Sequence, residues 1–195
     1  KAHKIMTDAG YTKNDQGMYV DKDGNAVSFT LTVNGSKTAH VGYAELIKTN
    51  LQAFGIQVTI EALDGNSYNA KTSNKFSENN ITMEAAIYGY TAAGMGMMNG
   101  LATIYVDGTH AVQGGAQVYD PAFQQIRDKM AAAKTAEDYI TAAGEMQDFY
   151  AENVPVIALY WDNMMFAHSA KYDGLVVDAV FFLNNVNTWF SICEK

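Results

Sequence analysis

Cysteine, arginine and long apolar runs are almost missing from this chain of 195 residues. The single cysteine, Cys193, excludes an internal disulfide and a cysteine-rich zinc site, and it fits a small packed apolar side chain. No apolar run is long enough to cross a bilayer. Residues 1–11 are polar and amphipathic, without the apolar core or cleavage site of a signal peptide. We therefore expect any export signal to lie outside this chain.

Positive charge is also scarce. Acidic residues number 21 against 13 lysines and arginines, a net charge of −8, and Arg127 is the only arginine. The lysines are scattered singly, so no basic patch offsets the repulsion between an acidic surface and a phosphate backbone. We therefore expect no nucleic-acid partner. Apolar residues, in contrast, make up 48% of the chain, which is enough for a substantial core.

Apolar residues in the first half switch between helical and strand spacing. This pattern predicts a helix over 1–9, a hairpin over 17–33 whose second strand has one buried face, and a helix over 38–54 stopped by Gly55. It then predicts a strand over 56–62, a short helix opened by 64–67, and a central strand over 83–90. Strands that alternate with helices favour parallel neighbours. The expected fold class is α/β, with a mixed, partly parallel sheet flanked by helices.

Capping residues define two helices in the second half of the chain. Asp120 suits an N-cap with Pro121 at the first helical position, and Thr135 begins a capping-box-like start of the next helix. Asn153 and Pro155 bracket the end of that second helix.

The segments after these helices are less regular. The apolar run over 154–160 predicts a buried strand, and a turn at 172–174 precedes a predicted short strand over 175–177. The tail over 180–195 is aromatic but interrupted by asparagines. We expect this tail to pack against a part of the protein outside this chain.

The segment over 91–118 breaks the regular pattern. It is rich in glycine and methionine, and Asp107 is its only acidic residue. Loops of this length inside a compact domain are usually functional, and this one leaves the carboxyl end of a predicted strand, where open α/β sheets bind ligands. Met95 and Met97 suit core packing and a soft binding surface equally. Tyr90 favours binding, because a ring with one polar handle suits a cleft.

Motifs for nucleotides, metals and catalysis fail on spacing. Gly94, Gly96 and Gly100 are spaced as GxGxxxG and open no helix, unlike a dinucleotide fingerprint. The acidic run over 21–25 is better explained as a turn than as a calcium loop. The four histidines have no second ligand three or four positions away, and no nucleophile stands beside a base. We predict no cofactor, no metal site and no catalytic residue.

Five segments, in this order, resemble the family-5 solute-binding proteins of ABC importers for dipeptides, oligopeptides and nickel. They read KIMTDAGYTKNDQGMYVDKDGNAVSFTLTV, AELIKTNLQAFGIQVTIEAL, YGYTAAG, VYDPAFQQIRDKM and ENVPVIALYW. The third stands where the family often has a strand ending in Gly-Trp, followed by a small residue pair and an aspartate. The fourth stands at the family's Tyr-x-Asn/Asp-Pro helix start. The resemblance covers most of the chain.

The resemblance implies a periplasmic-binding-protein-like fold of class II, with residues 1–195 as one partial domain: a C-terminal lobe without its N-terminal lobe. It implies a binding protein, not an enzyme, that captures a peptide or other small solute between two lobes and delivers it to an ABC transporter permease. The location would be extracytoplasmic, in the periplasm or at the cell surface of a bacterium. Membrane association would come only through the permease or a lipid anchor outside this chain. By the same analogy the ligand-binding residues are Gly89, Tyr90, Thr91, Ala93, Met95, Met97 and Trp161.

Ala93 departs from the family pattern. In the oligopeptide binders an aspartate at this position pairs with the amino terminus of the peptide. Burying an unpaired charge is costly, so we expect a cleft with Ala93 to disfavour free α-ammonium groups and to take a less polar or differently charged solute. Two other interpretations stay open: a stand-alone α/β enzyme with residues 91–118 as an active-site lid, and an adhesion or scaffold module without a cleft.

Overall fold

A computed structural model describes residues 1–73, 83–89, 120–160, 165–178 and 182–195. The chain divides into two compact units, Lys1–Val156 and Ile157–Lys195. Each unit is described by itself.

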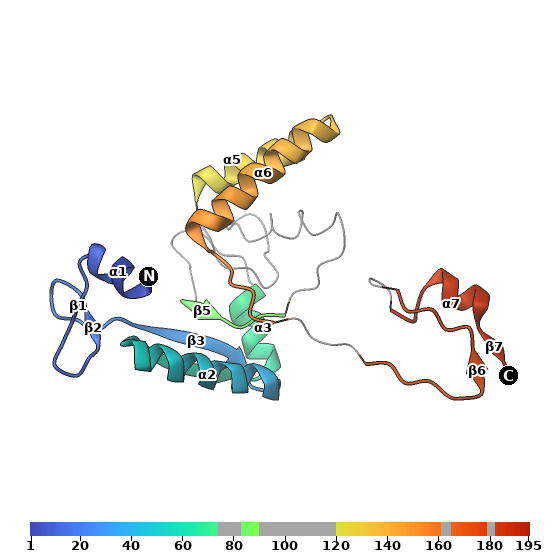
Figure 1. The fold of residues 1–195 in the computed structure, drawn as a ribbon, viewed down its shortest axis with the longest axis horizontal. Helices are drawn as coiled ribbons and strands as arrows, with labels where there is room; N and C mark the ends of the chain where they lie inside the picture. Colours follow the sequence, from blue (N-terminus) through green and yellow to red (C-terminus); the bar gives the residue numbers. More distant parts are fainter. Residues whose placement is uncertain (74–82, 90–119, 161–164, 179–181) are drawn as a thin grey trace. The chain divides into compact units, whose positions relative to one another are not determined.

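A three-stranded parallel sheet is the centre of the first unit (Figure 1). Its strands are β3 (Ser28–Asn34), β4 (Gln57–Leu63) and β5 (Ala85–Ala86), in the order β4-β3-β5. Helix α2 (Thr38–Phe54) connects β3 to β4, and α3 (Gly65–Ser73) follows β4. The predicted alternation of parallel strands and helices is therefore confirmed.

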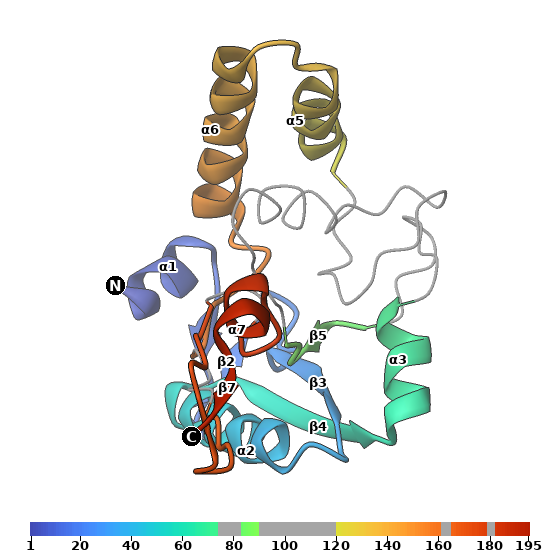
Figure 2. The ribbon, with the colours of Figure 1, turned by 90° about the vertical axis from the view of Figure 1, so that its right-hand side faces the viewer.

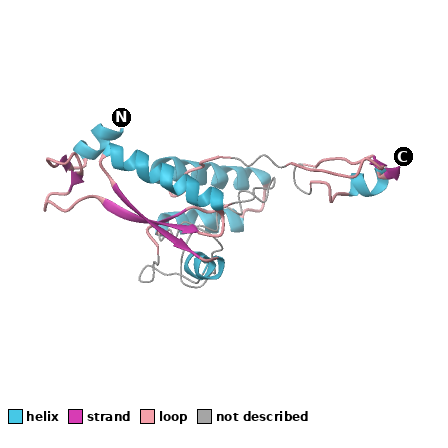
Figure 3. Ribbon diagram, turned by 90° about the horizontal axis from the view of Figure 1, so that it is seen from below, coloured by secondary structure: helices cyan, strands magenta, loops and turns pink. Residues whose placement is uncertain are grey.

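The two helices cover opposite faces of this sheet (Figure 3). Leu31 and Val33 of β3 and Val58 of β4 pack with Ala44 of α2 in one apolar cluster. On the other face the Thr32 hydroxyl donates to Glu61, which in turn pairs with Lys71 of α3. Because side chains alternate along a strand, one face of the sheet is apolar and the other polar.

Two details of the predicted sheet are wrong. Thr32 is 0% exposed, so β3 is buried on both faces. The reason is that β3, and not the 83–90 segment, is the middle strand of the described sheet, with a helix above and below it. The predicted 17–33 hairpin also fails beyond its turn. Val20 bridges Ala26 in antiparallel fashion, but β3 then pairs in parallel with β4 and β5.

The amino-terminal elements close one end of α2. They are α1 (Ala2–Asp8), β1 (Thr12–Lys13) and β2 (Tyr19–Val20), with the two strands antiparallel. The ring centroids of Tyr19 and Phe54 lie 5.3 Å apart, and the tilted rings of His3 and Phe54 have centroids 4.5 Å apart. Gly55 ends α2, as predicted, and adopts a left-handed φ of 114°. A Cβ there would lie 2.6 Å from the Gly17 carbonyl oxygen.

Helices α5 (Pro121–Ala132) and α6 (Ala136–Asn153) form an antiparallel hairpin (Figure 2). The predicted caps are confirmed: the Asp120 carboxylate accepts from the Ala122 amide at 2.8 Å, and the Thr135 hydroxyl from the Asp138 amide at 3.1 Å. The side chains between the helices form a second apolar cluster of Phe123, Met130, Ala142, Met146 and Phe149.

The predicted strand over 154–160 is wrong. The segment is irregular, and Val154, Ile157 and Leu159 are 53%, 70% and 49% exposed. A run of apolar residues becomes a buried strand only beside a partner strand, and no described strand pairs with this segment.

The second unit contains β6 (Tyr172–Asp173), α7 (Val186–Ser191) and β7 (Cys193–Glu194), with β6 and β7 antiparallel. The predicted strand over 175–177 is therefore displaced to 172–173. Asn185 caps α7 by accepting from the Thr188 amide at 2.9 Å, and its amide group donates to the Val176 carbonyl at 2.7 Å. The Thr188 hydroxyl also contacts Val176, so side-chain hydrogen bonds join the helix to the preceding segment.

Among the described helices, none has both the length and the apolar character needed to cross a membrane.

Candidate functional site

The carboxyl ends of the three parallel strands meet at one edge of the sheet. Strand β3 ends at Asn34, β4 at Leu63 and β5 at Ala86; short connections follow β3 and β4, and residues 87–89 are described after β5. Open parallel sheets bind ligands outside this edge, because the connections and helix amino termini there present free polar groups. We call this region, from Asn34 to Lys37, from Asp64 to Asn66 and from Ile87 to Gly89, the carboxyl edge.

Two connections of the carboxyl edge are in close contact. The Gly35 amide donates to the Leu63 carbonyl at 2.7 Å, and a Cβ at Gly35 would lie 3.3 Å from that oxygen. The Asn34 carboxamide oxygen accepts from the Ser36 amide at 3.0 Å. Glycine therefore lets the connection after β3 lie against the end of β4.

Asp64 closes the amino terminus of α3. Its carboxylate accepts from the Asn66 and Ser67 amides at 3.0 and 3.2 Å and from the Ser67 hydroxyl at 2.6 Å. These bonds, led by the one from the Ser67 hydroxyl, hold the pKa of Asp64 below its ordinary value. The charge of Asp64 thus stabilises the helix start.

The segment after β5, from Ile87 to Gly89, is attached to α3 through Tyr68. The Tyr68 hydroxyl donates to the Ile87 carbonyl at 2.7 Å, and the Tyr68 and Tyr88 rings stack with centroids 6.3 Å apart and planes inclined by 17°. Burial, with Tyr88 as a second cause, raises the pKa of Tyr68 to about 12. Its hydroxyl therefore stays protonated and remains a donor at neutral pH.

A polar cluster lies on the face of the sheet under α3. Glu61 accepts from the Lys71 ammonium at 2.5 Å and from the Thr32 hydroxyl at 2.7 Å. The hydrogen bond from Lys71 is the largest cause, and that from Thr32 the second, of a pKa of Glu61 below its ordinary value. The Glu61 and Lys71 side chains are 32% and 26% exposed, so the pair neutralises two partly buried charges.

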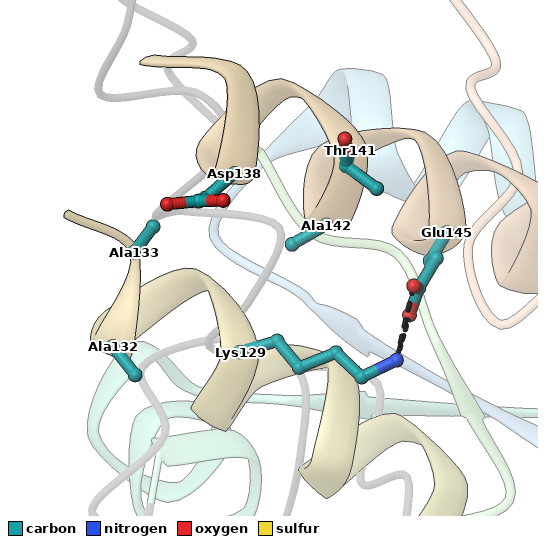
Figure 4. Close-up of a pocket in the computed structure, with 7 residues that line it drawn as sticks. All are labelled: Lys129, Ala132, Ala133, Asp138, Thr141, Ala142 and Glu145. Carbon is teal, nitrogen blue, oxygen red and sulfur yellow. Dashed lines mark hydrogen bonds and ion pairs between the residues drawn. The ribbon is translucent and has the colours of Figure 1, made fainter. Parts of the chain in front are cut away.

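A hollow lies between α5 and α6 (Figure 4). Figure 4 shows Lys129 of α5 reaching across to Glu145 of α6, with Nζ and Oε2 2.7 Å apart. Ala132, Ala133 and Ala142 also line the hollow. Small side chains leave the gap and the ion pair spans it, so this hollow is explained by the packing of the two helices.

One of the seven predicted ligand-binding residues is described by the structure. Gly89 lies at the carboxyl edge, three residues after β5, and among the described residues no atom lies within 4 Å of a Cβ placed there. The other six lie outside the described residues: Tyr90, Thr91, Ala93, Met95, Met97 and Trp161. Their roles stay predictions.

Sequence reasoning missed the stack of Tyr68 on Tyr88. Tyr88 lies in the predicted strand over 83–90 and Tyr68 directly follows the predicted helix start at 64–67, but nothing in the sequence brought the two together. The signal that could have found it was the alternation of side chains between the two faces of the sheet along residues 83–89. Ile87 belongs to the apolar cluster under α2, so Tyr88, the next residue, had to face α3.

Metal-ligating groups are dispersed over the part of the chain that the structure describes. No group of three or more His, Cys, Asp or Glu side chains comes close enough there to hold a metal ion.

The fold is shared with solved periplasmic binding proteins. Two crystal structures of a periplasmic oligopeptide-binding protein from Thermotoga maritima match the whole chain at 16% identity, with TM-scores of 0.77 and, with mannohexaose bound, 0.69. The chain spans 39% and 38% of them. The oligopeptide-binding protein AppA from Bacillus subtilis, in complex with a nonapeptide, has a TM-score of 0.68 at 16% identity, and the chain spans 37% of it. The α/β fold with a parallel sheet flanked by helices is therefore confirmed.

Sequence comparison gives the family. A probable ABC transporter-binding protein from Deinococcus radiodurans is 29% identical over 94 residues, which are 48% of this chain and 16% of the relative. Residues 1–111 match the model of the bacterial extracellular solute-binding proteins, family 5 Middle. That match covers more than half of the 195 residues and includes the whole carboxyl edge. The chain belongs to family 5 of the bacterial extracellular solute-binding proteins.

Proposed function

We propose that this chain is part of the substrate-binding component of an ABC importer and that its carboxyl edge contributes one wall of the solute site. The observation that carries the proposal is the position of Gly89. It lies inside the family match, three residues after a parallel strand, and a Cβ there would meet no atom of the described residues within 4 Å. Open α/β sheets bind ligands at this edge.

The solute is a peptide or another small molecule that lacks a free α-ammonium group. Proteins with this fold bind a nonapeptide in one case and mannohexaose in another, so the fold alone does not fix the ligand. The selection against free α-ammonium groups comes from Ala93, which provides no carboxylate where the oligopeptide binders have an aspartate. Burying an ammonium group without a partner costs roughly several kcal/mol, even after the surrounding protein has relaxed.

The complete protein acts outside the cytoplasm and hands its solute to the permease subunits of the importer. This part of the proposal follows from the family and from the Deinococcus radiodurans relative. The same match favours solute binding over the alternative of a stand-alone enzyme with residues 91–118 as a lid.

The experiment uses the complete gene product and a substitution that fills the open space. Because a Cβ at Gly89 meets no atom of the part of the chain that the structure describes within 4 Å, Gly89→Trp should fold and place an indole in the site. Gly42→Trp is the matched control, since Gly42 has equally open surroundings on α2. Binding is measured by calorimetry with neutral oligosaccharides, N-acetylated peptides and peptides with free amino termini.

We expect Gly89→Trp to weaken binding of the accepted solute class by tenfold or more, about 1.4 kcal/mol, and Gly42→Trp to leave it unchanged. Equal affinity in both variants would remove the carboxyl edge from the solute site. Turnover of a probe by the wild-type protein would instead support the enzyme alternative.

A further inference from the structure

Tyr88 stands beside Gly89 with a large part of its surface open. It is 40% exposed, although it follows Ile87, which is 5% exposed in the apolar cluster. Exposed tyrosine is common on protein surfaces. This one is unusual in its position, because it lies at the carboxyl edge and its ring is held by a second ring.

Tyr68 fixes the orientation of Tyr88. The Tyr68 ring is 3% exposed and stacks on the Tyr88 ring, while its hydroxyl donates to the carbonyl of Ile87, the residue before Tyr88. Backbone and ring of the same connection are thus attached to one side chain of α3. A ring immobilised before binding loses less entropy when a ligand stacks on it.

Three described charged groups on β4 and around the start of α3 make their contacts within the protein. Glu61 and Lys71 form an ion pair, and the Asp64 carboxylate is engaged by Ser67 and the start of α3. The described part of the carboxyl edge therefore offers an aromatic face, and its carboxylate, Asp64, already accepts hydrogen bonds from α3. Such a surface favours an uncharged ligand with flat C–H groups over an ion.

We propose that Tyr88 is a stacking platform for an uncharged ring of the solute and that Tyr68 is its positioning residue. The inference rests on the proposed function and adds the ligand chemistry: a ring that presents a C–H face. A sugar pyranose and an aromatic side chain of a peptide with blocked ends both have this chemistry. The two sources are separated by the probes used.

The test compares Tyr88→Ala, Tyr88→Phe and Tyr68→Phe in the complete gene product. The probes are maltohexaose and an N-acetylated, C-amidated tripeptide with a central phenylalanine, each measured by calorimetry. Tyr172→Ala is the matched control, since Tyr172 is 42% exposed and belongs to the second unit. Thermal unfolding of each variant shows whether it is folded.

Tyr88→Ala should weaken the bound probe about tenfold, because loss of a stacking ring costs on the order of 1 kcal/mol, and Tyr88→Phe should stay within about twofold. Tyr68→Phe keeps its ring but loses the bond to Ile87. It should weaken binding about threefold and restore mobility to the Tyr88 ring, observed as narrowed ring resonances of specifically labelled tyrosine. Tyr172→Ala should bind as wild type.

The outcomes distinguish failure of the stacking platform from failure of the proposed function. If the wild type binds a probe and Tyr88→Ala binds it equally well, the platform is overturned while solute capture stands. If a charged solute without a ring binds and the ring-bearing probes do not, the ligand class is overturned. If the wild type binds no solute at all, both the platform and the proposed function fail.

Discussion

Glu61 on β4 and Lys71 on α3 form an ion pair, with 2.5 Å between the carboxylate oxygen and the ammonium nitrogen. The Thr32 hydroxyl of β3 donates to the same oxygen. One carboxylate therefore joins two neighbouring strands to the helix that carries Tyr68. Loss of this charge should loosen α3 from the sheet.

We predict that ionised Glu61 contributes to the unfolding free energy and that this contribution is lost at acid pH. Its pKa is lowered in the folded state, mainly by the hydrogen bond from Lys71 and then by that from Thr32. The ionised form therefore stabilises the fold above the unfolded pKa of about 4.3, and this contribution is lost as the pH falls through the folded pKa. Urea unfolding should show Glu61→Gln to be about 1 kcal/mol less stable than wild type at neutral pH, with the difference vanishing at low pH.

The control for this pair is Asp8→Asn. Asp8 pairs with Lys4 at 2.8 Å, but the side chains are 60% and 78% exposed, so removal of the charge should change stability little. A Glu61→Gln variant that keeps the same deficit at every pH would show that the pair is not the cause.

We predict that the start of α5 depends on the acceptor at its N-cap. Asp120→Ala removes the oxygen that accepts from the Ala122 amide and should cost about 1 kcal/mol of unfolding free energy. Asp120→Asn keeps an equivalent acceptor and should stay within a few tenths of wild type. Amide hydrogen exchange in the first turn of α5 reports both results, and equal protection in the two variants would contradict the assignment.

Gly174 tests the packing of the second unit. Its φ is 78°, and a Cβ would clash with the Ser191 carbonyl oxygen at the end of α7. We predict that Gly174→Ala displaces α7 and abolishes the exchange protection of its amides. Gly10→Ala is the matched control, because φ is 90° there but nothing lies within 4 Å, so only the left-handed backbone penalty of about 1–2 kcal/mol applies. Similar losses of stability in the two variants would show that the contact with Ser191 does not matter.

The helices were predictable because their signals are local. Thr38–Phe54 was predicted with its end at Gly55, and Asp120 and Thr135 were predicted as caps. A capping side chain bonds to an amide two or three residues away, so the sequence alone contains both partners.

Strands and the site were less predictable because their partners lie far apart in sequence. The 154–160 run has the composition of a buried strand, but no described strand pairs with it. Thr32 and Glu61 meet only through the register of β3 with β4. Gly89 was predicted as a site residue by analogy with the family, whereas the stack of Tyr68 on Tyr88 required the paired sheet and α3 in place.

Native mass spectrometry of the complete gene product, purified from its own host without denaturation, tests the central claim most directly. Solute capture predicts a non-covalent adduct of a small molecule that is released on unfolding, and Ala93 and Tyr88 together predict an uncharged molecule that contains a ring. Ordinary peptides with free amino termini in the adduct would contradict that selection. A protein that carries no solute and gains none from host extract would contradict solute binding itself.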